Sequence, residues 1–97
     1  MNLSPNTQVR PGPDVLVSQV GDELVFLDLA SEQYFGLDAV GRTLWERLTT
    51  ARNAGDAIDA LLTEFEVDRA TLEQDVTALL QQLAARKLIE LDDGPTP

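Results

Sequence analysis

Three apolar runs follow one another early in the chain, and the connections between them are very short. The runs cover residues 15–20, 23–29 and 33–37, joined by Gly21-Asp22 and by residues 30–32. A two-residue turn with a glycine suits an antiparallel hairpin, because glycine adopts the positive φ angle that such turns require. Strands joined by tight turns form a meander. The sequence therefore predicts a three-stranded antiparallel sheet.

The middle run, residues 23–29, is apolar on both of its faces. Alternation along a strand places Leu24 and Phe26 on one face, and Val25 and Leu27 on the other. A strand that is apolar on both faces is typical of the centre of a sheet. We therefore expect residues 23–29 to be the central strand, with helices over most of one face.

The rest of the chain is dominated by helical patterns. Apolar residues recur at helical spacing in about 39–48, 56–65 and 68–87, and Asp38 and Asp68 are expected to cap the first and third helices. Residues 88–91 could add a short strand or cover the core. Strands followed by three helices predict an α+β fold that resembles a winged helix-turn-helix, with the wing before the helices. The expected buried stripe of the first helix is Val40, Leu44, Trp45 and Leu48.

One compact domain is expected, over residues 13–91. Residues 1–12 are polar and contain two prolines and a glycine, and residues 92–97 are acidic, so both ends are expected to be flexible tails. The start of the chain lacks the basic and apolar regions of a signal peptide, and no apolar run is long enough to span a bilayer. We therefore expect a cytoplasmic protein.

Composition excludes several classes of function. The chain of 97 residues has a formal net charge of −10, which disfavours nucleic acids and anionic membranes as partners. It contains no cysteine and no histidine, so neither a disulfide framework nor a thiolate nucleophile nor a typical zinc site is expected. Carboxylates Asp28, Glu32 and Asp38 lie near one another, but strand, turn and cap positions explain them better than an active site. We predict that the protein is not an enzyme and holds no cofactor.

A DNA-binding role is tested most directly by the third expected helix. In a winged helix-turn-helix this helix reads a DNA groove, yet Glu73 and Asp75 occupy its early turns here. These carboxylates would be repelled by phosphates. A transcription regulator therefore remains only a weaker alternative.

The strand expected at 33–37 offers a different kind of site. Nothing later in the chain has an evident pairing with its outer side, and an open edge can accept an extended peptide as an added strand. Gly36 leaves room for a guest side chain or for close backbone approach. The apolar stripe of the third helix is wide enough for part of it to face a groove beside this edge, although helical spacing alone favours a core position for all of it.

The ordered set of motifs resembles the PqqD-like family, also called RiPP recognition elements. The resemblance covers about residues 14–91 and includes Leu27-Asp28, the tyrosine strand, Leu37-Asp38, Leu44-Trp45 and the leucine-rich last helix. It implies a non-catalytic module that binds the leader segment of a ribosomally made precursor peptide. The leader would add to the strand at 33–37 and lie against the third helix.

The resemblance also implies contact residues and partners. The chain is most similar to the stand-alone recognition proteins of lasso-peptide clusters, which implies three partners: a leader with a Tyr-x-x-Pro pattern, a leader peptidase and a macrocyclase. A chaperone of the pyrroloquinoline quinone type, working beside a radical SAM enzyme, is the alternative within the family. The contacts implied by position are Gln33, Tyr34, Phe35, Gly36 and Leu37 on the strand, and Leu72, Asp75, Val76, Leu79, Leu80 and Leu83 on the helix.

Overall fold

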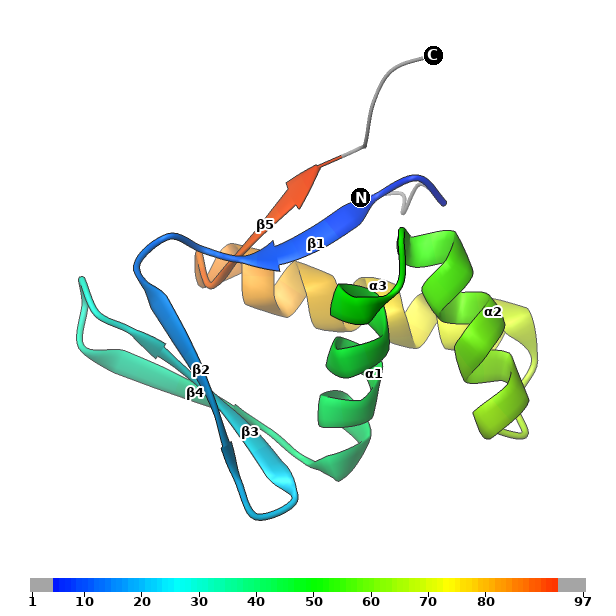
Figure 1. Cartoon of the computed structure of the whole chain (residues 1–97), viewed down its shortest axis with the longest axis horizontal. Helices are drawn as coiled ribbons and strands as arrows, with labels where there is room; N and C mark the ends of the chain where they lie inside the picture. The colour runs from blue at the N-terminus through cyan, green and yellow to red at the C-terminus, as the bar shows by residue number, and fades with distance from the viewer. Residues whose placement is uncertain (1–4, 93–97) are drawn as a thin grey trace.

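The computed structural model describes residues 5–92, and it confirms the α+β class. A three-stranded antiparallel sheet lies at one end of the molecule and three helices lie at the other, with a separate two-stranded sheet along the top (Figure 1). Among the described residues, no helix is long and apolar enough to cross a membrane. In chain order the elements are β1 (Gln8–Pro11), β2 (Val15–Val20), β3 (Glu23–Asp28), β4 (Gln33–Leu37), α1 (Ala39–Thr50), α2 (Ala54–Glu64), α3 (Arg69–Ala85) and β5 (Ile89–Asp92).

The predicted meander is present, in the order β2-β3-β4. Val20 pairs with Glu23 across the first turn, where Gly21 has a φ of 62°. The second turn is held by Asp28, whose carboxylate accepts hydrogen bonds from the Ala30 backbone N–H and the Ser31 hydroxyl, each at 3.0 Å. These two turns fix the register, so β3 is central and β4 lies at an edge.

The core forms where β3 meets the helices. Phe26 is fully buried, and its ring meets that of Trp45 edge to face, with the ring centroids 4.9 Å apart and the planes at 80°. Aromatic pairs favour this geometry because the positive edge of one ring meets the negative face of the other. Leu24 and Leu37 are buried on the same side of the sheet. The contact therefore joins the central strand to α1.

The helix starts depend on side-chain caps. The Asp38 carboxylate accepts a hydrogen bond from the Gly41 N–H, and that of Asp68 from the Thr71 N–H, as the sequence predicted. Asn53 caps α2 in the same way through the Asp56 N–H, so α2 begins two positions earlier than expected. The other helix boundaries differ from the expected ones by one or two residues, which is the usual uncertainty in assigning helix ends.

The expected burial of Val40 is wrong, because its side chain is 57% exposed. The buried stripe of α1 consists of Gly41, Leu44, Trp45 and Leu48 instead. A Cβ atom at Gly41 would lie 3.1 Å from the Leu37 Cβ, so the glycine permits close approach between the helix and the end of β4. The first turn is therefore rotated to put Gly41, rather than Val40, against the sheet.

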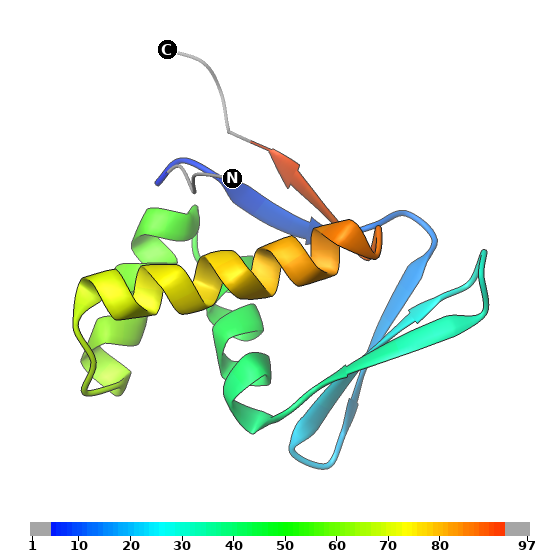
Figure 2. The same ribbon diagram turned by 180° about the vertical axis from the view of Figure 1, so that it is seen from behind.

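The expected N-terminal tail is wrong for residues 5–12. β1 pairs with β5 in antiparallel fashion, with Val9 opposite Leu91, and the two strands run side by side above the helices (Figure 2). The Gly12 N–H donates to the Leu88 carbonyl at 2.9 Å, and the Ala54 N–H to the Thr7 carbonyl at 2.7 Å. Backbone pairing, which leaves little trace in a polar sequence, therefore orders this segment. The rest of the tail, residues 1–4, lies outside the described residues, as do residues 93–97 of the expected acidic tail, whereas Asp92 ends β5.

The ordering of β1 can be tested at Val9, which is buried in the core. We expect Val9→Ala to lower the free energy of unfolding by about 2 kcal/mol, because methyl groups are lost from a packed site. Gln8→Ala, at an exposed position on the same strand, should leave stability unchanged. Urea unfolding followed by circular dichroism would measure both variants. Equal stability of Val9→Ala and the wild type would contradict the ordered β1.

The cap at Asp68 predicts a pH dependence of stability. The backbone N–H of Thr71 donates to its carboxylate at 2.7 Å and holds the pKa of Asp68 below its ordinary value. Since the pKa is lower in the folded than in the unfolded chain, the stabilisation is complete above the unfolded value and is lost as pH falls through the folded value. Asn also caps helices but does not titrate in this range.

We therefore expect Asp68→Asn to lose less stability than the wild type when the pH is lowered from neutral into the acid range. Thermal unfolding of both proteins at a series of pH values would measure the two slopes. Identical slopes would show that this carboxylate does not contribute to acid unfolding.

Candidate functional site

The candidate site is the outer edge of β4. The strand order leaves β4 paired on one side only, and no other strand of residues 5–92 lies on its free side. Figures 1 and 2 agree that β1 and β5 lie away from this edge. An open edge presents backbone N–H and C=O groups that an added strand can satisfy. The edge is therefore available for strand addition.

The register determines which way the β4 side chains point. Phe35 lies opposite the buried Phe26, so Phe35 and Leu37 face the helices. Tyr34 lies opposite Leu27, and Tyr34 and Gly36 therefore face outward. Tyr34 is 76% exposed, whereas Leu37 is buried. This alternation places Gly36 on the open face.

A cavity of about 260 Å³ lies between β4 and the end of α3. The guanidinium carbon of Arg86 lies 4.6 Å from the centroid of the Phe35 ring, so a cation–π contact spans the two elements. The cavity thus has one wall from the sheet edge and one from the helix. Its lining residues are Asp28, Ser31, Gln33, Tyr34, Phe35, Ala85, Arg86 and Leu88.

The helix residues of the predicted contact set occupy two different environments. Five are buried among the core side chains: Leu72, Val76, Leu79, Leu80 and Leu83. Val76, Leu80 and Leu83 have no exposed surface, because the stripe packs against the other elements of the core. Only Asp75 is exposed. The structure therefore leaves Asp75 and the strand residues other than Leu37 at least partly exposed, and it places most of the leucine stripe in the core.

Sequence reasoning missed the exposed helix residues nearest β4. Ala85 and Arg86 line the cavity, and neither belongs to the predicted contact set. Residues one and two turns apart share a helix flank, so Leu79, Gln82 and Arg86 form one row. Leu79 is at the margin of the core, and Gln82 is exposed. Following that row from Leu79 towards the helix end would have identified these residues.

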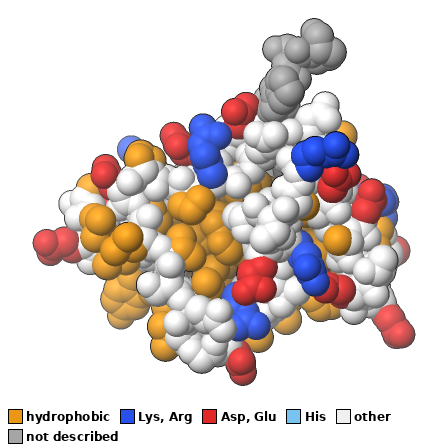
Figure 3. Space-filling model, in the orientation of Figure 1, with side chains coloured by type: hydrophobic (Ala, Val, Ile, Leu, Met, Phe, Trp, Pro, Cys, Tyr) orange, Lys and Arg blue, Asp and Glu red, His pale blue; other side chains and the backbone are white. Residues whose placement is uncertain are grey.

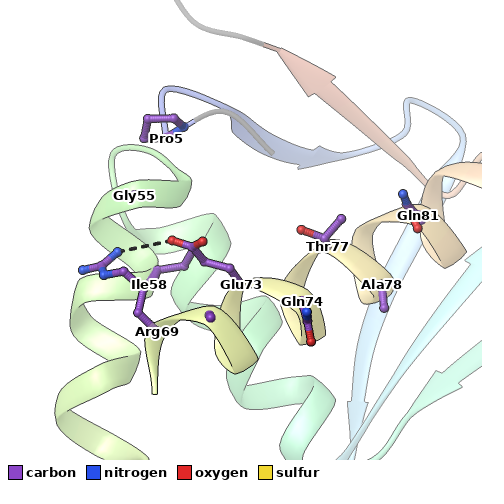
Figure 4. Close-up of a pocket in the computed structure, with 10 residues that line it drawn as sticks. Pro5, Gly55, Ile58, Arg69, Glu73, Gln74, Thr77, Ala78 and Gln81 are labelled. Carbon is purple, nitrogen blue, oxygen red and sulfur yellow. Dashed lines mark ion pairs between the residues drawn. The ribbon is translucent and has the colours of Figure 1, made fainter. Parts of the chain in front are cut away.

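A larger hollow of about 700 Å³ lies on another flank of α3, where the helix faces α2 and Pro5 (Figure 4). It shares no lining residue with the cavity beside β4. Arg69 and Glu73 form an ion pair across one turn at 3.7 Å, and Arg69 also donates to Asp59. The hydrogen bond to Asp59 raises the pKa of Arg69. These charges are mutually satisfied, and the hollow offers no nucleophile with an adjacent base.

The acidic residues near β4 have structural roles. Asp28 holds the turn after β3, and Asp38 caps α1. Among the described residues, no group of three carboxylates, histidines or cysteines is placed to hold a metal ion. The cap at Asp38 is as expected, whereas Asp28, which was expected to be a strand residue only, also holds the turn after β3.

Comparisons with known proteins agree on one family. The sequence model described as "Coenzyme PQQ synthesis protein D (PqqD)" matches residues 23–89. The solved structure "TbiB1 in Complex with the TbiA(beta) Leader Peptide" is 36% identical, with a TM-score of 0.74 over 93% of this chain and 95% of that chain. "Lasso peptide synthetase B1 complexed with the leader peptide" is 28% identical, with a TM-score of 0.78 over 86% of this chain and 98% of that chain. No curated protein matches. Since the family match covers most of the sequence, this chain belongs to the PqqD family.

Proposed function

We propose that this protein is a non-catalytic module that binds the leader segment of a ribosomally made precursor, that of a lasso peptide. The observation that carries the proposal is the open edge of β4 with a helix-walled cavity beside it. The similarity to two proteins whose structures are described as complexes with leader peptides supports it. Bound leader would then be presented to the enzymes that process the precursor.

In the proposed binding mode, the leader adds to the sheet as a strand beside β4. Its backbone pairs with the free N–H and C=O groups of the edge, which supplies affinity without requiring a particular sequence. Alternate leader side chains then point either to the outer face or towards α3. The proposed contacts are Gln33, Tyr34, Phe35, Gly36 and Leu37 from β4, with Asp75, Leu79, Gln82 and Ala85 from α3 and Arg86 from its C-cap.

The buried helix residues have a supporting role in this proposal. Val76, Leu80 and Leu83 lie wholly within the core, so contact with a leader would require α3 to move. We assign them to fixing the position of the helix wall. Leu72 is also buried and belongs with them.

Selectivity is proposed to come from the cavity beside β4. It combines the apolar ring of Phe35 with polar groups of Gln33, Ser31 and Arg86 at its walls. An amphipathic or compact apolar anchor suits such a site, as the tyrosine or the proline of a Tyr-x-x-Pro leader would provide. Arg86 would exchange its contact with Phe35 for one with the guest.

A role in pyrroloquinoline quinone biosynthesis is the second candidate, favoured by the description of the matching family model. The same edge would bind a different precursor and would serve a radical SAM enzyme. Titration with a lasso-peptide leader and with a pyrroloquinoline quinone precursor distinguishes the two functions, because only the cognate peptide should bind tightly. DNA binding is disfavoured, since Glu73 and Asp75 are exposed on α3 and the chain carries a net charge of −10.

The binding site can be blocked without altering the core. Ala85 is exposed and lines the cavity beside β4, so Ala85→Trp should fill that cavity and weaken leader binding by about tenfold or more. Ala78 is exposed on the same helix but lines the other hollow, so Ala78→Trp is the matched control with wild-type affinity. Fluorescence anisotropy of a labelled leader peptide would measure both affinities, and circular dichroism would verify both folds.

A second arm of the experiment tests strand addition. Methylating a leader backbone nitrogen that pairs with β4 removes one donor and should weaken binding, whereas methylating a nitrogen outside the paired segment should not. Equal affinity of the folded Ala85→Trp and Ala78→Trp proteins would remove the cavity from the site. Equal affinity of every methylated leader would remove strand addition.

A further inference from the structure

The outer face of the meander is apolar, and no described element covers it. The cross-strand pairing places Leu16, Leu27 and Tyr34 in one row on the face opposite to the helices. Val25 lies beside this row, between Ser18 and Gly36. All three helices lie on the other side of the sheet (Figures 1 and 2).

The exposure of this face is large for side chains of this type. Leu16 is 53% exposed, Val20 60% and Leu29 52%, and each lies on or next to the outer face. Hydrophobic side chains gather over the sheet half of the molecule in Figure 3. Single exposed apolar residues are ordinary on protein surfaces, but a contiguous patch marks an interaction site.

The turns and strand ends that border the outer face are acidic. Between Pro11 and Gly41 the sequence contains six acidic residues and no lysine or arginine. Glu23 lies on the outer face itself, opposite Val20, and Asp22 lies in the adjoining turn. Asp14 precedes β2, and Glu32 lies in the turn before β4. The face is therefore an apolar centre within an acidic rim.

We propose that this outer face, defined by Leu16, Val20, Val25 and Leu27, is a docking surface for an enzyme that processes the leader-bound precursor. The partner surface that fits it is apolar at its centre and carries lysine and arginine at its border. Opposite charges around an apolar centre raise the association rate and orient the complex, while the apolar area supplies the affinity.

The charge argues against two other occupants. A second copy of this chain would bring its own acidic rim against the first, and like charges across an interface are unfavourable. An anionic membrane surface would be repelled in the same way. The acidic rim therefore favours a different protein, one whose own interface has lysine and arginine at its border.

The outer face meets the proposed leader groove only at Tyr34 and Gly36, and its β2 side lies away from the groove, so a leader and an enzyme can be bound together. The groove lies between the free edge of β4 and α3, whereas Leu16 and Val20 lie on β2, two strands away from that edge. A carrier that keeps its leader bound while it meets an enzyme needs such an arrangement. This inference depends on the proposed function only in the choice of the partner enzyme as the probe.

The test uses the purified leader peptidase and the double variant Leu16→Ser/Val20→Ser. Serine is tolerated on this face, since Ser18 already lies between the two positions. We expect the double variant to bind the peptidase at least about tenfold more weakly than the wild type, because two apolar contacts are lost at the centre of the interface. Val67→Ser is the matched control, since Val67 is an exposed valine between α2 and α3. It should bind as the wild type does.

The charged border is tested by Glu23→Lys, which should slow association with the peptidase, with the largest effect at low salt. Leader affinity is measured on the same samples, and it should be unchanged in all three variants. If the wild type does not bind leader, this result would contradict the proposed function but not the docking role of the outer face.

Three results would overturn the docking surface. The first is equal peptidase affinity of the double variant and the wild type, and the second is a wild type that does not bind the peptidase. The third is a wild-type dimer in sedimentation that the double variant converts to a monomer, because this would assign the face to a second copy.

Discussion

The edge-to-face contact between Phe26 and Trp45 determines how the sheet meets the helices. Phe26 belongs to the central strand and Trp45 to α1, so the contact fixes the meander against the helical layer. β4 follows β3 through a short turn and leads directly into α1, with only Asp38 between the two elements. With both ends of β4 held in this way, its free edge has a fixed position relative to α3. A groove between a strand edge and a helix needs this rigidity to bind an extended peptide with selectivity.

The two terminal segments determine whether that edge stays open. β1 and β5 are short strands that could in principle extend the meander, yet they pair with each other above the helices. The Gly12–Leu88 hydrogen bond joins the two at the point where the chain enters the meander. In the described part of the chain, the two terminal strands therefore pair with each other, and the outer edge of β4 has no strand beside it. This pairing also covers the core at Val9 and Ile89, which a small domain needs.

Sequence reasoning predicted those parts of the fold that depend on local patterns. The meander, the positive φ of Gly21 and the caps at Asp38 and Asp68 depend on residues only a few positions apart in the sequence. β1 was missed because its pairing with residues 89–92 is non-local and its single buried side chain, Val9, produces no periodic signal. For the site, the strand at 33–37 could be predicted, since an unpaired edge follows from strand order. The helix wall was missed because the contacts were assigned to the leucine stripe, most of which packs into the core, and not to the neighbouring row of Leu79, Gln82 and Arg86.

An open strand edge and an apolar sheet face are both liabilities, since either one promotes pairing between copies of a chain. In this protein the two surfaces adjoin at Tyr34, which makes the risk greater. Six acidic residues and no basic residue lie between Pro11 and Gly41, the part of the chain that forms the meander, and Arg86 is the cation that lines the cavity beside β4. Their mutual repulsion opposes edge-to-edge and face-to-face contact between two copies, while a peptide or enzyme of opposite charge is attracted. The same charge distribution therefore disfavours contact between two copies and favours partners of opposite charge.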